Sequence, residues 1–146
     1  MRKQNLLALI TMVVWFLHSC TPSPQPIEFG TDPCAHCKMS IVDKPFAAEM
    51  VTTKGKVYKF DAIECMAQFI QEEDENNIAL LLVRDFNNPD EWVDANSAFF
   101  LISKELPSPM GGYLSAYPTK TAAEAMQAEK GGEILTWEQL KQKYAR

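Results

Sequence analysis

The feature that most constrains the fold is an order of strand-like and helix-like stretches that occurs twice. In the first half, residues 46–53 and 56–60 are rich in β-branched and aromatic residues, and Gly55 marks a hairpin turn between them. Residues 62–73 carry apolar residues at helical spacing, and 78–86 form a nearly continuous apolar run of the kind found in interior strands. This half predicts the order strand, strand, helix, strand.

The second half predicts the same order. Strands are predicted at 98–102, 112–117 and 133–137, and helices from a cap at Thr119 or Thr121 to Glu129 and, opened by Thr136 or Trp137, over 138–144. Gly131 and Gly132 end the first of these helices. Neither half is large enough to bury its own apolar face, so we expect one α+β domain built from two packed ββαβ-type units.

The start of the first predicted helix carries a capping pattern. Asp61 stands at the N-cap position and Glu64 follows three residues later, an arrangement that satisfies the first free amides of a helix. One face of the helix is predicted to be apolar, with Ile63, Met66, Ala67 and Ile70. The capping role accounts for Asp61 without a metal ion.

The N-terminus has the pattern of an export signal. Arg2 and Lys3 precede an apolar run over residues 6–17, which is too short for a permanent transmembrane helix. The ending Leu17 to Cys20 resembles the bacterial lipobox, in which the cysteine is lipidated, and a plain secretory signal is the alternative. We expect a lipoprotein signal peptide at 1–19, lipidation at Cys20 and a location in the bacterial cell envelope, facing the periplasm.

A proline-rich stretch follows the lipobox-like ending. Its composition favours an extended spacer, so 20–31 is predicted to be the lipidated cysteine with a flexible linker, and 32–146 the folded domain. The formal net charge is −5, and loss of the two positive charges of Arg2 and Lys3 makes it −7. This charge argues against nucleic acid and against an anionic lipid surface as partners.

Three cysteines remain if Cys20 is lipidated. In an oxidising compartment an odd number leaves at least one thiol without an internal partner, unless a metal ion occupies the thiolates. Cys34 and Cys37 form a Cys-x-x-Cys motif that contains His36. The motif also occurs in thiol-disulfide oxidoreductases, which gives an alternative function, but the following residues 38–42 lack a helical face. A structural zinc site needs four ligands, usually with a second Cys-x-x-Cys or a His pair, and the sequence contains no second pair.

Sulfur ligands from two regions favour copper. Met39 follows Cys37 by two residues, so on an extended segment both side chains would point to the same side. Met110 stands in a loop between prolines and glycines, which would display it. Thiolates and thioethers select Cu(I). Each methionine could equally be core or turn filler.

Cys65 is a further candidate residue, and the sequence contains no recognisable catalytic pattern. Cys65 lies in the first predicted helix and could be a third sulfur ligand, a disulfide partner of Cys34 or a buried thiol. No nucleophile, base and acid stand in a recognisable order, and no glycine loop for phosphate occurs. We therefore predict a binding protein and not an enzyme.

Taken together, these segments resemble the NosL family of copper-binding lipoproteins. The resemblance rests on the ending at Cys20, Tyr58-Lys59-Phe60-Asp61, Cys37-Lys38-Met39 in place of the family's Cys-Gly-Met, Met110-Gly111-Gly112 and Gly131-Gly132. It implies two ββαβ units like those of organomercurial lyase. It also implies a metallochaperone that delivers Cu(I) to the nitrous oxide reductase system of denitrification, or to a related periplasmic copper protein. Carried over by position, Cys37, Met39 and Met110 are the implied ligands, with Cys34, and less firmly Cys65 and His36, as additions.

Overall fold

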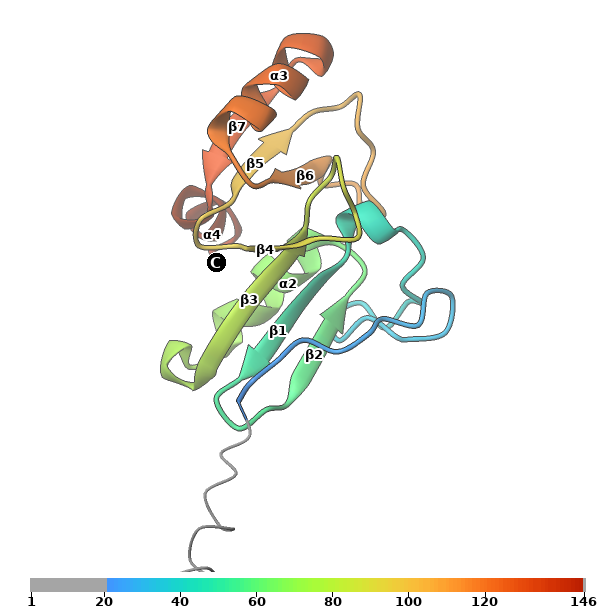
Figure 1. The fold of residues 1–146 in the computed structure, drawn as a ribbon, viewed down its shortest axis with the longest axis vertical. Coiled ribbons are helices and arrows are strands. Elements are labelled where there is room, and N and C mark those ends of the chain that lie inside the picture. The colour runs from blue at the N-terminus through green and yellow to red at the C-terminus, as the bar shows by residue number, and fades with distance from the viewer. Residues whose placement is uncertain (1–20, 146) are drawn as a thin grey trace, which may run out of the picture.

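Two antiparallel sheets form the framework of the protein. The computed structural model describes residues 21–145; the predicted signal peptide and Cys20 lie outside the described residues. The first sheet has the order β2-β1-β3-β4, formed by β1 (Ala48–Thr52), β2 (Val57–Phe60), β3 (Ile78–Arg84) and β4 (Trp92–Asp94). Helix α2 (Ile63–Phe69) connects β2 to β3 and lies against one face of this sheet (Figure 1). Within residues 21–145 no helix is both long and apolar enough to cross a membrane.

The second sheet repeats the pattern of the first. It has the order β6-β5-β7, formed by β5 (Phe99–Ile102), β6 (Leu114–Tyr117) and β7 (Glu133–Thr136). Helix α3 (Lys120–Lys130) connects β6 to β7, and α4 (Trp137–Tyr144) follows. In both units the first strand is central and pairs antiparallel with the second and third. The predicted α+β fold of two ββαβ units is confirmed.

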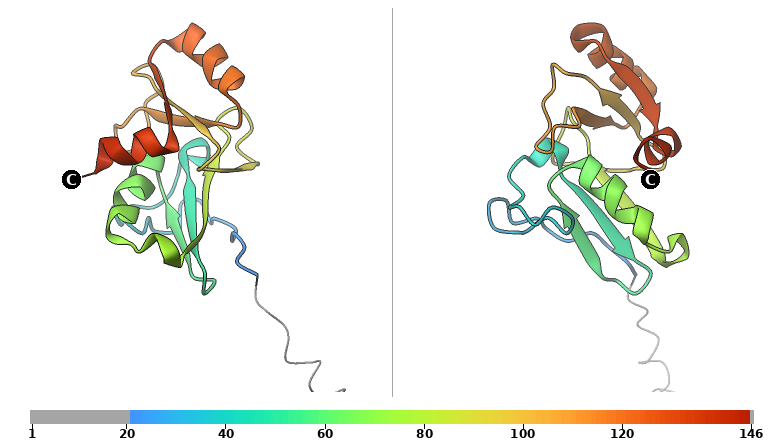
Figure 2. Two further views of the ribbon diagram at one scale, coloured as in Figure 1. Left: turned by 90° about the vertical axis from the view of Figure 1, so that its left-hand side faces the viewer. Right: turned by 180° about the vertical axis from the view of Figure 1, so that it is seen from behind.

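One hydrophobic core joins the two units. Helix α2 contacts α4 and the edge of the second sheet (Figure 2). The main core contains fully buried residues from both units, among them Met50, Phe60, Ile63, Met66, Phe100, Leu114 and Leu140. A smaller cluster, Leu101, Tyr117 and Ala123, lies under α3. Because residues of both units share one buried cluster, the protein is one packed domain.

Two of the three predicted helix N-caps agree with the structure, and one does not. Thr119 and Thr136 cap α3 and α4 as predicted, and Thr136 forms a capping box with Gln139. At α2 the predicted capping box is wrong. The N-cap is Ala62, Asp61 accepts a hydrogen bond from the Val42 backbone at 3.3 Å, and Glu64 is turned inward with 2% of its surface exposed.

The helical region that begins with α2 is also more broken than predicted. The chain continues through two short 3-10 turns, η2 (Ile70–Glu72) and η3 (Glu75–Asn77), before β3. The predicted helix over 62–73 therefore contains one α-helix of two turns and a tighter final turn. Its predicted apolar face is buried, which agrees with the helical spacing of those residues.

The segment before the cysteine motif lies along the first sheet. Ile27 is buried, the Gln25 backbone donates to Glu49 Oε2 at 3.1 Å, and Lys59 Nζ donates to the Pro26 carbonyl. The structure therefore places the last part of the predicted linker, from Gln25 onward, against the domain. This contact fixes where the chain enters the cysteine motif.

Candidate metal centre

A closed loop presents the first two cysteines. The backbones of Gly30 and Ile41 are hydrogen bonded at 2.7 Å, and Pro33 and Ser40 form an isolated bridge. Inside this frame the Cys34 amide donates to the Met39 carbonyl at 2.8 Å. We call residues 30–41 the cysteine loop. Its backbone pairs across its own base, so the positions of its side chains are fixed by local hydrogen bonds.

The cysteine loop is also fastened to β2. The Ala35 amide donates to the Lys59 carbonyl at 2.8 Å. The Lys59 ammonium group forms an ion pair with Asp32 at 2.7 Å, and this hydrogen bond lowers the pKa of Asp32. Both side chains are mostly buried, at 19% and 24% exposure, so solvent screens the pair less than it would an open surface pair. The loop is therefore held rigidly beside the strand that leads into α2.

The prediction of an extended Cys37 to Met39 segment is wrong. Lys38 has a φ of 67° in the left-handed region, and its amide donates to the Cys34 carbonyl at 3.0 Å, which closes a turn. A side chain at this φ is sterically disfavoured, whereas glycine adopts it freely. The glycine of the Cys-Gly-Met pattern would fit this backbone without strain.

Three thiols converge between the loop and α2. The sulfur atoms of Cys34, Cys37 and Cys65 all lie within 4.8 Å of one another. All three cysteines are free; Cys34 and Cys65 are buried, and Cys37 is partly exposed. Three sulfurs placed about 2.3 Å from one central ion, the usual zinc–thiolate distance, would lie roughly 4 Å apart. The thiol cluster thus requires little contraction to hold a metal ion.

Hydrogen bonds distribute the protons of the thiol cluster unequally. The Cys65 thiol donates to Cys34, and backbone amides, Asp61 first among them, also point at this sulfur, so the pKa of Cys34 is lowered. The same bond, together with burial, raises the pKa of Cys65. Burial raises the pKa of Cys37. These shifts favour the thiolate form at Cys34, and the thiolate is the form of cysteine that binds a metal ion.

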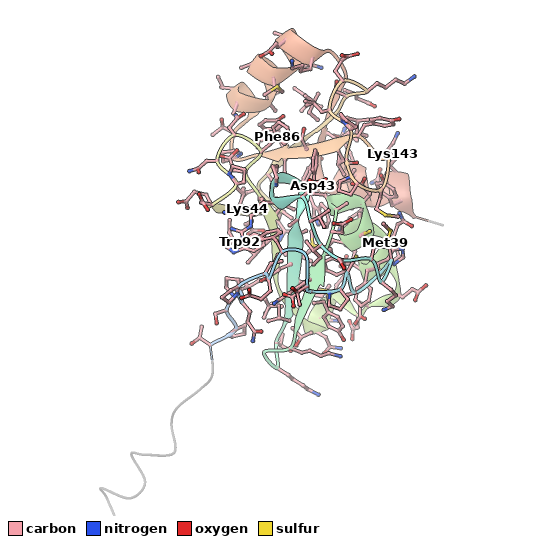
Figure 3. The ribbon with its side chains drawn as sticks, turned by 90° about the vertical axis from the view of Figure 1, so that its right-hand side faces the viewer. Met39, Asp43, Lys44, Phe86, Trp92 and Lys143 are labelled. Carbon is pink, nitrogen blue, oxygen red and sulfur yellow. The ribbon has the colours of Figure 1, made fainter. Side chains whose placement is uncertain are left out.

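The two predicted methionine ligands lie on exposed loops. Met39, two residues after Cys37 and labelled in Figure 3, is 56% exposed, and Met110 is 40% exposed. The loop of Met110 is tied to α2, because the Gly112 amide donates to Glu64 Oε1 at 3.0 Å. Glu64 precedes Cys65 in the sequence, so the Met110 loop is attached to the helix that carries the third thiol.

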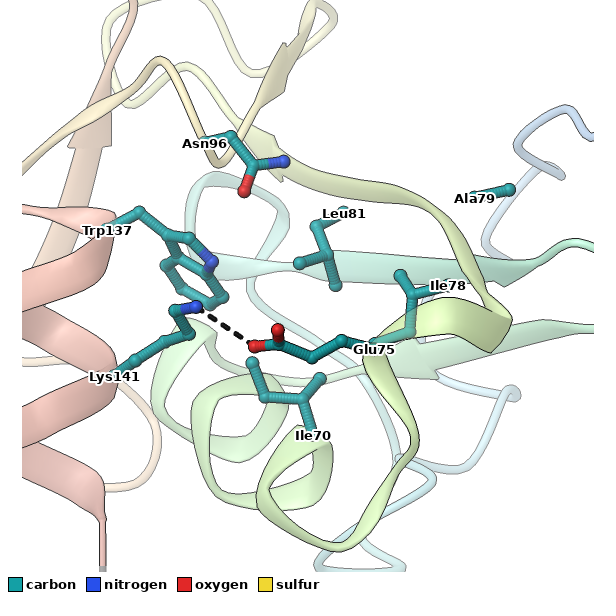
Figure 4. Close-up of a pocket in the computed structure, with 8 residues that line it drawn as sticks. All are labelled: Ile70, Glu75, Ile78, Ala79, Leu81, Asn96, Trp137 and Lys141. Carbon is teal, nitrogen blue, oxygen red and sulfur yellow. Dashed lines mark hydrogen bonds and ion pairs between the residues drawn. The ribbon is translucent and has the colours of Figure 1, made fainter.

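His36 lies outside the thiol cluster. Its side chain lines a separate hollow of about 260 Å³ with Phe69 and Tyr144. A further hollow of about 230 Å³ lies between the two units. Its lining includes Trp137 and the ion pair of Lys141 and Glu75, whose charged atoms are 3.1 Å apart (Figure 4). Neither hollow is lined by a cysteine, so the thiol cluster is a separate site.

Comparison with known proteins identifies the family of this chain. Residues 26–145 match the family model described as NosL. The chain belongs to the NosL family. A NosL relative from Stutzerimonas stutzeri, named copper-binding lipoprotein NosL, is 30% identical over 129 residues, which cover 82% of this chain and 68% of the relative. The crystal structure of the copper chaperone NosL from Shewanella denitrificans matches the fold with a TM-score of 0.70 at 23% identity, over 81% of this chain and 95% of that chain.

Sequence reasoning did not resolve two features of this candidate site. It left Cys65 with three possible roles, and it assigned Glu64 to helix capping. Both depend on contacts across at least 28 positions of the chain, from Cys37 to Cys65 and from Glu64 to Gly112. The odd number of cysteines was the available signal for Cys65, whereas Glu64 carries no comparable signal in a single sequence.

Proposed function

We propose that this protein is a Cu(I) metallochaperone of the cell envelope. The proposal rests on one observation, the convergence of three free thiols from two separate chain segments within 4.8 Å. Thiolate sulfur selects soft monovalent copper. The names of the two relatives, a copper-binding lipoprotein and a copper chaperone, support the same reading and describe no enzymatic reaction.

The thiol cluster supplies the tight part of the site in this proposal. Cys34, Cys37 and Cys65 bind the copper ion, and binding displaces the protons that Cys37 and Cys65 carry. Cys34 is fully buried, which shields the ion from water and from exposed competing ligands. Cys37 is the thiol through which copper enters and leaves, because it is the one with partial exposure.

The exposed methionines supply the transfer part. Met39 and Met110 offer thioether sulfur at the surface, where a partner protein can reach them. A thioether is neutral and weaker than a thiolate, so copper passes outward by stepwise exchange of ligands. A closed cage of four thiolates would hold the ion without such a route.

The partner and the location follow from the family resemblance. We propose lipidation at Cys20, attachment to a membrane of the bacterial envelope, and a domain that faces the periplasm. The client is the nitrous oxide reductase system or a related periplasmic copper protein. The thiol-disulfide oxidoreductase alternative is disfavoured, because the fully buried Cys34 is inaccessible to a protein disulfide and no helix begins at the motif.

A competition titration tests the proposal. Reduced protein is titrated with Cu(I) against a chromophoric Cu(I) chelator, and one ion per chain is expected. Replacing Cys34, Cys37 or Cys65 by serine should weaken binding strongly, and Met39→Leu or Met110→Leu should weaken it less. His36→Asn, outside the thiol cluster, is the matched control and should bind like the wild type. Unchanged affinity in all three serine variants would refute the site.

A further inference from the structure

Glu64 connects the Met110 loop to α2. Its carboxylate Oε1 accepts hydrogen bonds from the Ser108 hydroxyl and from the Gly112 amide, the latter at 3.0 Å. The Ser108 oxygen in turn accepts from the Tyr113 amide at 2.8 Å. Both attachment points lie on one oxygen atom, and Met110 stands midway between Ser108 and Gly112 in sequence. The loop tip that carries Met110 is therefore pinned on both sides.

The fit between the loop and Glu64 leaves no spare room. A Cβ atom added to Gly112 would lie 2.8 Å from the Glu64 carboxyl carbon and 3.0 Å from the Tyr144 hydroxyl oxygen. Real Cβ atoms essentially never come within 3.0 Å of another atom, so a side chain at this position would displace the Glu64 carboxylate. The backbone of the loop at Gly112 therefore lies directly against the Glu64 carboxylate of α2.

The carboxylate is expensive to bury, which argues for a role beyond packing. Glu64 is 2% exposed, and its second oxygen, Oε2, has no hydrogen-bond partner within the part of the chain that the structure describes. A buried carboxyl group that is only partly hydrogen bonded stabilises a fold poorly compared with an apolar residue of the same size. No lysine or arginine pairs with it among the ion pairs of residues 21–145.

We propose that Glu64 is a positioning residue that fixes Met110 relative to the thiol cluster. Resting on the proposed function, this inference makes the carboxylate an outer partner of the copper site, one residue before Cys65. It does not bind the ion. It holds the thioether of Met110 at a set distance from the helix that carries Cys65, so that the methionine is preorganised for copper transfer.

Affinity measurements on matched variants test the inference. Glu64→Leu removes both acceptors at nearly constant volume and should weaken Cu(I) binding about 10- to 100-fold, the usual effect of losing an outer partner of a metal ligand. Glu64→Gln keeps an oxygen in the Oε1 position and should restore affinity close to the wild-type value. Ser108→Ala removes one of the two bonds without touching α2, so it tests the same link if Glu64→Leu fails to fold.

A second buried carboxylate provides the control. Glu49 is fully buried on β1 and, like Glu64, has one oxygen without a partner among residues 21–145, but it faces the N-terminal segment. Glu49→Gln should leave the dissociation constant for Cu(I) unchanged. Thermal unfolding of each copper-free variant separates loss of affinity from loss of the fold.

A double-mutant cycle shows whether the effect passes through Met110. In a Met110→Leu background, Glu64→Leu should cause no further loss, because the ligand that it positions is already absent. With ¹³C-methyl-labelled methionine, Cu(I) should shift the Met110 signal in the wild type but not in Glu64→Leu, while the Met39 signal shifts in both.

The outcomes distinguish this inference from the proposed function. Unchanged affinity in Glu64→Leu and Ser108→Ala, together with weakened binding in Met110→Leu, would overturn the positioning role and leave the copper site intact. Equal losses from Glu64→Leu with and without Met110 would also overturn it. Failure of the wild type to bind Cu(I) would instead refute the proposed function on which it rests.

Discussion

Replacing Glu49 by glutamine should stabilise the protein at neutral and alkaline pH. Glu49 lies on the central strand β1 with no exposed surface. Burial raises its pKa to about 7 from an ordinary value of 4.5, against the opposing effects of the hydrogen bond from Gln25 and the charges of Lys59 and Arg84. A carboxyl group with a raised pKa in the folded state makes folding less favourable once it must ionise.

The sign and size of the effect follow from this pKa. Below pH 4.5 the group is protonated in both states and costs nothing. Between about pH 4.5 and 7 the unfolded chain releases the proton and the folded protein keeps it, so the free energy of unfolding falls by about 1.4 kcal/mol per pH unit. Above pH 7 the full penalty is roughly 3 kcal/mol. Glutamine avoids this penalty, but it buries an amide N–H₂ group, which lowers the free energy of unfolding by about 1 kcal/mol.

Urea unfolding followed by tryptophan fluorescence measures the difference. We expect Glu49→Gln to be more stable than the wild type by roughly 2 kcal/mol at pH 8, to lose this advantage as the pH falls through about 5, and to be less stable by about 1 kcal/mol at pH 4.5. Reductant and a copper chelator keep the thiols free in both proteins. Glu133→Gln, at an exposed position on β7, is the control and should give parallel curves. A stability difference at Glu49 that is constant between pH 5 and pH 8 would refute the reasoning.

Three further predictions concern the fold. Gly132→Ala places a Cβ atom 2.1 Å from the Ile102 carbonyl oxygen and should lower the free energy of unfolding by more than about 3 kcal/mol. Gly131→Ala meets no atom within 4 Å and should lower it by only about 1–2 kcal/mol, because of the positive φ at that position. Equal shifts of the melting temperature in the two variants would contradict this prediction. Thr136→Ala removes a capping box and should lower the free energy of unfolding, measured by urea denaturation, by about 1 kcal/mol. An unchanged urea midpoint would contradict this prediction. Lys59→Met breaks the ion pair at the base of the cysteine loop and should cost about 1 kcal/mol and speed hydrogen exchange of the loop amides.

The order of strands and helices could be predicted because it depends on residues that are close in the sequence. The alternation of strands, the helical spacing in α2 and the threonine caps at Thr119 and Thr136 each depend on residues a few positions apart. The repeated order of elements then limited the fold to two units that share a core. The family resemblance narrowed this to a known pair of ββαβ units.

The site was less accessible to the same reasoning, because its contacts are distant in sequence. Asp61 and Glu64 have the spacing of a capping box, yet tertiary contacts with Val42 and with the Met110 loop use both side chains. The turn at Lys38 was also missed, since nothing in a lysine announces a left-handed conformation. The cysteine count and the sulfur-containing segments pointed to a shared site, without showing which thiols meet.

The three cysteines come from two segments of the chain, so binding of a metal ion would affect the stability of the fold. Cys34 and Cys37 come from the loop and Cys65 from α2, so an ion held by all three staples two parts of the chain that otherwise separate on unfolding. An ion that binds only the folded protein raises the free energy of unfolding by about 4 kcal/mol when its free concentration is a thousand times its dissociation constant. The melting temperature is therefore a direct gauge of how much of the protein is loaded.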